Sequence, residues 1–362
     1  MTDYNGKYFK FQESFHWVAD AAKGIPRRVP IYAQLCELIP GEMGKSATQV
    51  FQDPELLNVG TFTICEKYGI DVPTVDFDTY NIEAEALGQK LIFHDEIMPD
   101  IDRAHSYIQE EKDIGKIVTP DFDKAGRCPF VVEVYTVFEK LTGVNASMAF
   151  CAPFSLAANI RGIENLVLDM CLRPKFAHEL MTRVTDELLI PWLEYLKGKF
   201  PNTPALVGAD ALASLPIVNI KLMDEFIAPY VERLRAACGP NVIVPNWTGE
   251  RYAKNPQEVM DIRLRVNPSF VEGQDPDVEV LGPEFYKAYA EKHDIPLLLG
   301  VGAVFLRTGT PEEIFNRVKH YVEVGGKNGR LWIYLCNIEP GTPMENIKAA
   351  VNAVHEYGTY IE

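Results

Sequence analysis

The chain has 362 residues, of which 47% are hydrophobic and 24% are charged, and its formal net charge is −16. This composition is typical of a globular protein with a large apolar core and excludes a disordered chain. The strong negative charge disfavours nucleic acid and an anionic membrane surface as partners, because both are themselves negatively charged.

The predicted elements begin with an amphipathic helix near Gln12–Ala22. Seven short apolar segments without polar alternation follow, as expected of parallel strands that are buried on both faces. The strands are predicted at Val29–Leu35, Ser147–Ala152, Ala205–Ala209, Val242–Val244, Ser269–Glu272, Pro296–Val301 and Leu331–Leu335. The stretch Val75–Arg127 is less regular, and we expect it to be an excursion packed on the main fold.

Helix starts are marked by a capping residue that precedes proline. Thr310-Pro311-Glu312-Glu313 and Thr342-Pro343-Met344-Glu345 both predict a capping box, and Asn255-Pro256-Gln257-Glu258 resembles one. Asp53-Pro54-Glu55 and Gly282-Pro283-Glu284 are weaker versions of the same signal. From Ala205 onward, strands and helices alternate regularly, which is the pattern of parallel βαβ units.

This alternation suits either an open doubly wound sheet or a closed barrel. No Gly-x-Gly-x-x-Gly follows the first strand, and no P-loop motif occurs, so a nucleotide-binding open sheet is disfavoured. No linker divides the chain. We therefore predict a single domain over residues 1–362, an α/β fold of the parallel (β/α)8 TIM-barrel type with an N-terminal helical extension. In such barrels the active site lies at the carboxyl ends of the strands.

The cysteines and the apolar runs of the sequence indicate in which cellular compartment the protein is found. Seven widely spaced cysteines without a Cys-x-x-Cys pair argue against a disulfide framework and favour a reducing, cytoplasmic environment. The longest nearly apolar run, Ile295–Leu306, is too short to span a bilayer. We expect a cytoplasmic protein without a membrane segment.

Two motifs near the C-terminus carry a resemblance to a known family. They are Thr308-Gly-Thr-Pro-Glu-Glu-Ile314 and Leu335-Cys-Asn-Ile-Glu-Pro-Gly-Thr-Pro-Met-Glu-Asn346. Looser matches, in the same order along the chain, are Cys151-Ala-Pro-Phe-Ser-Leu-Ala157 and Ala209-Asp-Ala-Leu-Ala-Ser214. With these motifs the chain resembles the uroporphyrinogen decarboxylase superfamily over nearly its whole length.

The resemblance implies either decarboxylation of a porphyrinogen or cobalamin-dependent methyl transfer. The decarboxylases of the superfamily carry an arginine-rich segment after the first strand, whereas Gln34–Gly41 contains no arginine to bind substrate carboxylates. The thiol methyltransferases bind zinc through His-x-Cys-Gly and a later cysteine. Here Asn246-Trp-Thr-Gly249 stands in the place of that motif, and only Cys336 remains.

The resemblance therefore favours a substrate-side methyltransferase of a corrinoid system. Such enzymes take a methyl group from a methyl ether or a methylamine and pass it to cobalt(I) on a separate corrinoid protein. Here we expect a methyl ether, an aryl methyl ether first, so the predicted reaction is O-demethylation. A uroporphyrinogen-type decarboxylase, a methylcobalamin:thiol methyltransferase and a non-catalytic binding homologue remain alternatives. The methyl donor, the corrinoid partner and the oligomeric state are left open by the sequence.

The predicted catalytic residues are Asp210, Asn246 and Glu272, which lie at or just after the ends of predicted strands. An alkoxide or phenolate leaves poorly, so the enzyme must supply a proton or a Lewis acid to the departing oxygen. Each residue also has a structural interpretation. Asp210 could cap the next helix, Asn246 could shape a turn and Glu272 could lie in a solvated loop.

The predicted substrate-binding residues are Glu133, Trp247, Gln274 and Cys336. Glu133 lies in an apolar segment, where burial would raise the pKa of its carboxyl and make it an acid. Zinc is a possible further cofactor besides the partner's corrinoid. If a metal is bound, Asp210, Glu272 and Cys336 are its expected ligands, and protonation by a carboxylic acid is the metal-free alternative.

Overall fold

The computed structural model describes residues 6–24 and 26–360. Contacts divide the chain into two compact units. Unit 1 consists of Met1–Asp76, Val137–Val144 and Ser269–Glu362, and unit 2 consists of Phe77–Thr136 and Asn145–Pro268. The single domain expected over residues 1–362 stays a prediction.

Unit 1 is built on a four-stranded parallel sheet with the order β1-β9-β8-β7. Its strands are β1 (Ile31–Ala33), β7 (Val271–Gln274), β8 (Leu297–Val301) and β9 (Leu331–Leu335). One register row runs across the sheet through Gln274, Gly300, Tyr334 and Tyr32. Val72 adds a single parallel bridge to Tyr32, a β contact that the sequence did not reveal.

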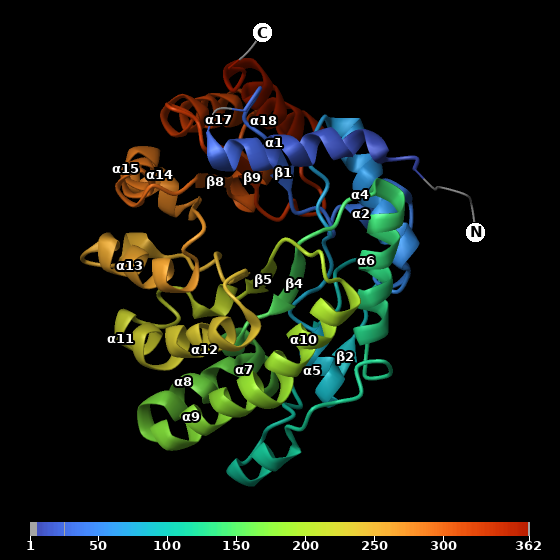
Figure 1. Ribbon diagram of the computed structural model, residues 1–362, viewed down its shortest axis with the longest axis vertical. Helices are drawn as coiled ribbons and strands as arrows, with labels where there is room; N and C mark the ends of the chain where they lie inside the picture. Colours follow the sequence, from blue (N-terminus) through green and yellow to red (C-terminus); the bar gives the residue numbers. More distant parts are fainter. Residues whose placement is uncertain (1–5, 25, 361–362) are drawn as a thin grey trace. The chain divides into compact units, whose positions relative to one another are not determined.

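The helices of unit 1 cover this sheet and confirm most of the predicted helix starts. They are η1 (Phe9–Phe11), α1 (Gln12–Lys23), α2 (Ile39–Met43), α3 (Ala47–Val50), α4 (Pro54–Tyr68), α14 (Asp277–Leu281), α15 (Pro283–His293), α16 (Ala303–Thr308), α17 (Pro311–Gly325) and α18 (Met344–Tyr357). Helices α17 and α18 pack on each other, and α17 contacts β8 and β9 (Figure 1). The N-terminal helix α1 packs by Ala21 against Leu298 and Trp332.

The two predicted capping boxes have different outcomes. Thr310 accepts a hydrogen bond from the Glu313 N–H, and the Glu313 side chain accepts one from Thr310, as predicted. The box predicted at Thr342 is wrong. Helix α18 begins at Met344 with Pro343 as its N-cap and without a side-chain cap, and the Thr342 hydroxyl donates to the Glu339 carbonyl at 2.8 Å.

Unit 2 contains the parallel sheet β4-β5-β6 and a two-stranded antiparallel pair, β2-β3. The strands are β2 (Leu91–Ile92), β3 (Asp100–Ile101), β4 (Met148–Cys151), β5 (Leu206–Ala209) and β6 (Val242–Ile243). All seven parallel strands predicted from the sequence are therefore confirmed. Most of them are shorter than predicted, and β7 runs two residues further, to Gln274.

The helical elements of unit 2 follow its strands in chain order. They are α5 (Ile82–Leu87), η2 (Glu111–Lys116), α6 (Cys128–Thr142, whose last six residues belong to unit 1), α7 (Pro153–Arg161), α8 (Ile163–Leu172), α9 (Pro174–Arg183), η3 (Val184–Leu189), α10 (Ile190–Lys199), η4 (Ala211–Ala213), α11 (Ile220–Leu222), η5 (Met223–Ile227), α12 (Ala228–Cys238), η6 (Glu250–Tyr252) and α13 (Pro256–Val266). Helices α7, α8 and α9 pack on one another (Figure 1).

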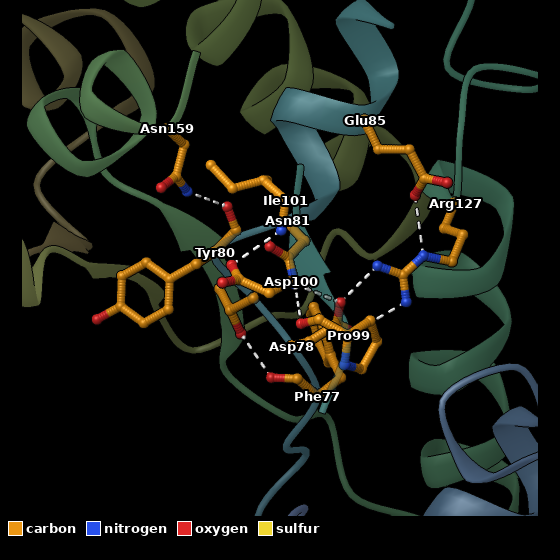
Figure 2. Close-up of polar contacts among 11 residues, drawn as sticks. Phe77, Asp78, Tyr80, Asn81, Glu85, Pro99, Asp100, Ile101, Arg127 and Asn159 are labelled. Carbon is orange, nitrogen blue, oxygen red and sulfur yellow. Dashed lines mark hydrogen bonds and ion pairs between the residues drawn. The ribbon is translucent and has the colours of Figure 1, made fainter. Parts of the chain in front are cut away.

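The irregular excursion is anchored in unit 2 by a buried ion pair. Arg127 donates to Asp78 from Nη1 at 2.9 Å and to Glu85 from Nε at 2.9 Å (Figure 2). Asn81 also donates to the Asp78 carboxylate, at 2.8 Å, and to the Pro99 carbonyl, at 2.7 Å. These bonds fix the loop that precedes α5 and therefore the position of the side chains on it.

No helix in the described part of the chain is long and apolar enough to cross a membrane.

Candidate functional site

Asp210 follows β5 directly and is fully buried. Its Oδ1 accepts a hydrogen bond from the Ser155 N–H at 2.8 Å, and its Oδ2 accepts one from the Trp247 Nε1–H at 3.0 Å. Burial raises the pKa of the Asp210 carboxyl to about 6, although both donors oppose this shift. The carboxyl therefore joins the loops that follow β4, β5 and β6.

Gly208, on β5 two residues before Asp210, lies very close to side chains of the neighbouring segments. A side chain at Gly208 would place its Cβ 2.7 Å from Val244 Cγ2 and 2.9 Å from Phe150 Cζ. No atoms approach so closely without a shift, so only glycine allows β5 to lie between its neighbours in this way. Gly208 thus contributes to the position of Asp210.

Asn246 follows β6 and links Asp210 to a tyrosine. Its Oδ1 accepts the backbone N–H of Asp210 at 2.9 Å, and its Nδ2 donates to the Tyr80 hydroxyl oxygen at 3.2 Å. The Ala211 N–H donates to the same oxygen at 3.1 Å. Asp210 and Asn246, predicted separately from the sequence, are thus brought together. Tyr80 was missed, because it lies in the irregular excursion and no motif marks it.

Trp247 is also fully buried. Since its indole has no exposed surface and donates to Asp210, it supports that carboxyl and does not line an open pocket. We call Tyr80, Ser155, Asp210, Asn246 and Trp247 the Asp210 cluster.

A second buried carboxyl lies near the end of β4. Glu83, on α5, accepts the Cys151 N–H through Oε1 at 3.1 Å, and burial raises the pKa of Glu83 to about 8. The sequence did not indicate this residue, because its burial depends on how α5 packs against β4. Glu83 therefore holds the end of this strand as Asp210 holds the loops beyond it.

In unit 1 the structure brings Glu272, Gln274 and Cys336 together. Gln274 Nε2 donates to Glu272 Oε1, and both side chains come from β7. A Cβ placed on Gly300 would lie 2.6 Å from Cys336 Sγ and 3.0 Å from Gln274 Cγ, so both side chains reach over this glycine. Glu272 and Cys336 are 6% and 9% exposed, which leaves Gln274 as the more accessible polar group.

A stacked tyrosine pair lies in the same register row as Gln274. The rings of Tyr32 and Tyr334 are stacked with their centroids 4.8 Å apart, and the Tyr334 hydroxyl donates to Gln34 Oε1 at 2.9 Å. Both tyrosines are half-buried. In the sequence, nothing distinguishes these two tyrosines from core residues, because no alternation of polar and apolar residues marks the strands that carry them.

Glu133 is exposed, so it is not the buried acid that one interpretation of its apolar segment suggested. Glu133 lies on the exposed side of α6, while its helical neighbours Val134 and Tyr135 are buried. The apolar segment around it is one face of an amphipathic helix, and the charged residue lies on the other face. A substrate-binding role for Glu133 therefore has no support from its position.

Within each unit, two of the four strand-end residues lie together. Asp210 and Asn246 lie together in unit 2, and Glu272 and Cys336 lie together in unit 1. A common mouth for all four stays a prediction.

Comparison with known proteins decides the family. The family model described as Uroporphyrinogen decarboxylase (URO-D) matches residues 18–357. The chain belongs to the uroporphyrinogen decarboxylase family.

Members of this family similar to the chain include enzymes with two activities. A methylated-thiol–coenzyme M methyltransferase of Methanosarcina mazei is 24% identical over 83% of this chain and 76% of its own length. A uroporphyrinogen decarboxylase of Anaeromyxobacter dehalogenans is 25% identical over 57% of this chain and 56% of its own length. The first of these relatives, which matches the larger share of the chain, supports a methyltransferase of the uroporphyrinogen decarboxylase family.

The solved structure of a methyltransferase from Methanosarcina mazei is similar to the chain with a TM-score of 0.77. The match has 16% sequence identity and covers 96% of this chain and 98% of the other. It confirms the predicted fold class, the parallel α/β barrel of this family.

The residues do not fit the zinc site that some members of the family use. No three His, Cys, Asp or Glu side chains among the described residues cluster so that they could hold a metal ion. Burial and the nearby Glu272 carboxylate raise the pKa of the Cys336 thiol well above its ordinary value. Both Asp210 oxygens are already occupied by donors. We derive no step through zinc.

Proposed function

We propose that this member of the uroporphyrinogen decarboxylase family is a corrinoid-dependent methyltransferase that performs O-demethylation. Its donor is a methyl ether, with an aryl methyl ether as the first candidate, and its acceptor is carried by a separate corrinoid protein. The cobalt(I) corrinoid supplies the nucleophile that takes the methyl group. The chain itself has to bind the ether, orient its methyl group and stabilise the departing oxygen.

One observation carries this proposal: the Asp210 cluster contains no arginine or lysine, and the side chains in it that can donate a hydrogen bond are neutral. A porphyrinogen with several carboxylates requires cations at its binding site. An ether oxygen and the phenolate it becomes require a hydrogen-bond donor instead. The absence of arginine from Gln34–Gly41 agrees with this distinction.

The residues have separate tasks in this proposal. Asp210 has no exposed surface, so it acts by holding the Ser155 backbone and the Trp247 indole in place and does not touch the ether. Asn246 orients the groups at the end of β6.

A second candidate is methyl transfer from a methylated thiol. It is favoured by the activity for which the Methanosarcina mazei relative is named, and that relative matches 83% of this chain. It is disfavoured by Asn246 and Thr248, which replace the histidine and cysteine of the thiol-enzyme motif.

The test is to incubate the purified chain with cob(I)alamin and a panel of methyl donors. The absorption spectrum of the corrinoid reports its methylation. We expect methylation with methoxylated aromatics and not with methylamines. Transfer from methylated thiols alone would favour the second candidate. Absence of transfer from every donor, together with decarboxylation of a porphyrinogen, would reject both.

A further inference from the structure

The hydrogen bonds around Tyr80 have a direction that can be assigned. A backbone N–H can only donate, so the Asp210 N–H must meet the oxygen of the Asn246 amide, at 2.9 Å. The nitrogen of that amide therefore faces Tyr80 and donates to its hydroxyl oxygen, at 3.2 Å. The orientation of the amide, which is ordinarily ambiguous, is settled here by the backbone.

The Tyr80 oxygen consequently accepts two hydrogen bonds, from Asn246 and from the Ala211 N–H. A phenolic hydroxyl has one proton, and with both donors on its oxygen this proton must point elsewhere. No acceptor for it occurs among the described residues of unit 2. Tyr80 is half-buried, and Ala211, whose N–H donates to its oxygen, is exposed, so this hydrogen bond lies beside the surface of the unit.

The Tyr80 ring is held firmly enough to present this proton. Its carbonyl accepts the Asn159 Nδ2–H at 2.7 Å, and its neighbour Asn81 donates to Asp78, which is paired with Arg127. Figure 2 shows the ring directed away from that ion pair. Burial raises the pKa of the Tyr80 phenol above its ordinary value, so the hydroxyl keeps its proton at neutral pH.

We propose that Tyr80 donates a hydrogen bond to the oxygen of the bound substrate, and that the substrate class is set by this donor: an ether whose leaving group is a phenolate or alkoxide. This inference rests on the proposed function and names its oxygen-binding residue. In the reaction the methyl–oxygen bond breaks and both of its electrons stay on oxygen, while the methyl group passes to the cobalt(I) nucleophile of the corrinoid. Tyr80 stabilises the resulting oxyanion with its hydrogen bond and keeps its own proton, and the released phenolate is protonated by solvent.

Binding of 4-nitrophenol, whose phenolate absorbs visible light, tests the donor without any methyl transfer. A hydrogen bond to a charged oxygen implies that Tyr80→Phe binds the probe about 10- to 100-fold more weakly than the wild type. Tyr107→Phe is the matched control, because the Tyr107 hydroxyl donates to the Lys116 carbonyl and takes no part in the Asp210 cluster. It should bind the probe like the wild type, and urea unfolding of both variants checks that they are folded.

Methyl transfer from 4-methylanisole and 4-nitroanisole gives the second readout. The loss of rate in Tyr80→Phe should be about tenfold greater with 4-methylanisole, because its phenolate is the poorer leaving group and depends more on the donor. The Tyr80 proposal is overturned if the wild type and Tyr80→Phe bind 4-nitrophenol equally well, or if neither protein binds it. Transfer from no ether by the wild type overturns the proposed function instead, whatever the result with the probe.

Discussion

Replacing Asp210 with asparagine tests whether the buried carboxyl is linked to protonation of the folded chain. The two carboxyl oxygens accept hydrogen bonds from the Ser155 N–H and the Trp247 Nε1–H. An asparagine amide accepts on one side only, so one of these buried donors would face an NH₂ group and lose its partner. Such an unsatisfied donor lowers the free energy of unfolding by ~1–3 kcal/mol, and this cost does not depend on pH.

The carboxyl of the wild type adds a contribution that does depend on pH. Burial raises the Asp210 pKa from 3.8 to about 6, so the folded chain binds this proton more tightly than the unfolded chain. The resulting stability is fully present below the unfolded pKa and is lost as the pH rises through the folded pKa of about 6. A difference of about 2 pH units, at about 1.36 kcal/mol for each, amounts to ~3 kcal/mol.

The stability advantage of the wild type over Asp210→Asn should therefore shrink by ~3 kcal/mol between about pH 4 and about pH 8. Urea unfolding of both proteins, followed by tryptophan fluorescence at a series of pH values, measures this difference. Other titrating groups cancel because both proteins contain them. Asp53→Asn, at the exposed start of α4, controls for loss of a carboxylate at the surface. An advantage that stays constant across this pH range would refute the proton linkage of Asp210.

Two further predictions concern the framework of unit 2. Arg127→Met should lower the free energy of unfolding by ~3–5 kcal/mol, because it leaves the buried Asp78 carboxylate without its cation. Urea unfolding measures this loss, and a value under about 1 kcal/mol would show that the pair is not buried in solution. Gly208→Ala should cost ~1–3 kcal/mol, because its Cβ would meet Val244 and Phe150. The control is Gly198→Ala in α10, where the new Cβ meets open space, and it should be neutral or slightly stabilising. Equal losses of stability in the two variants would contradict the packing argument.

The chain organisation of this protein could be predicted from local patterns. The strand Leu331–Leu335 has the predicted bounds, because a parallel strand buried on both faces is a run of apolar residues whatever its neighbours are. The start of α17 was predicted because the capping box at Thr310 is made by residues three positions apart. The same signal failed at Thr342, whose N–H and hydroxyl both donate to the Glu339 carbonyl in a turn, and the helix begins after Pro343.

The candidate site was predicted only in part. Asp210 and Asn246 were identified because each follows a strand, and a parallel α/β fold brings the carboxyl ends of its strands to one edge. Glu133 misled because its apolar neighbours in the sequence lie on the other side of a helix. The tasks of Asp210 and Trp247 could not be inferred either, since both depend on a hydrogen bond between residues 37 positions apart.

By itself, the sequence determined the order of the seven parallel strands, the starts of several helices, the family and the residues at the strand ends. These are properties of neighbouring residues or of motifs. Tertiary structure alone decided that Tyr80 belongs to the site, because its hydroxyl meets groups 131 and 166 residues further along the chain. Hydrogen bonds over such separations leave no periodic or local trace in a sequence, since they form only when packing brings distant segments together.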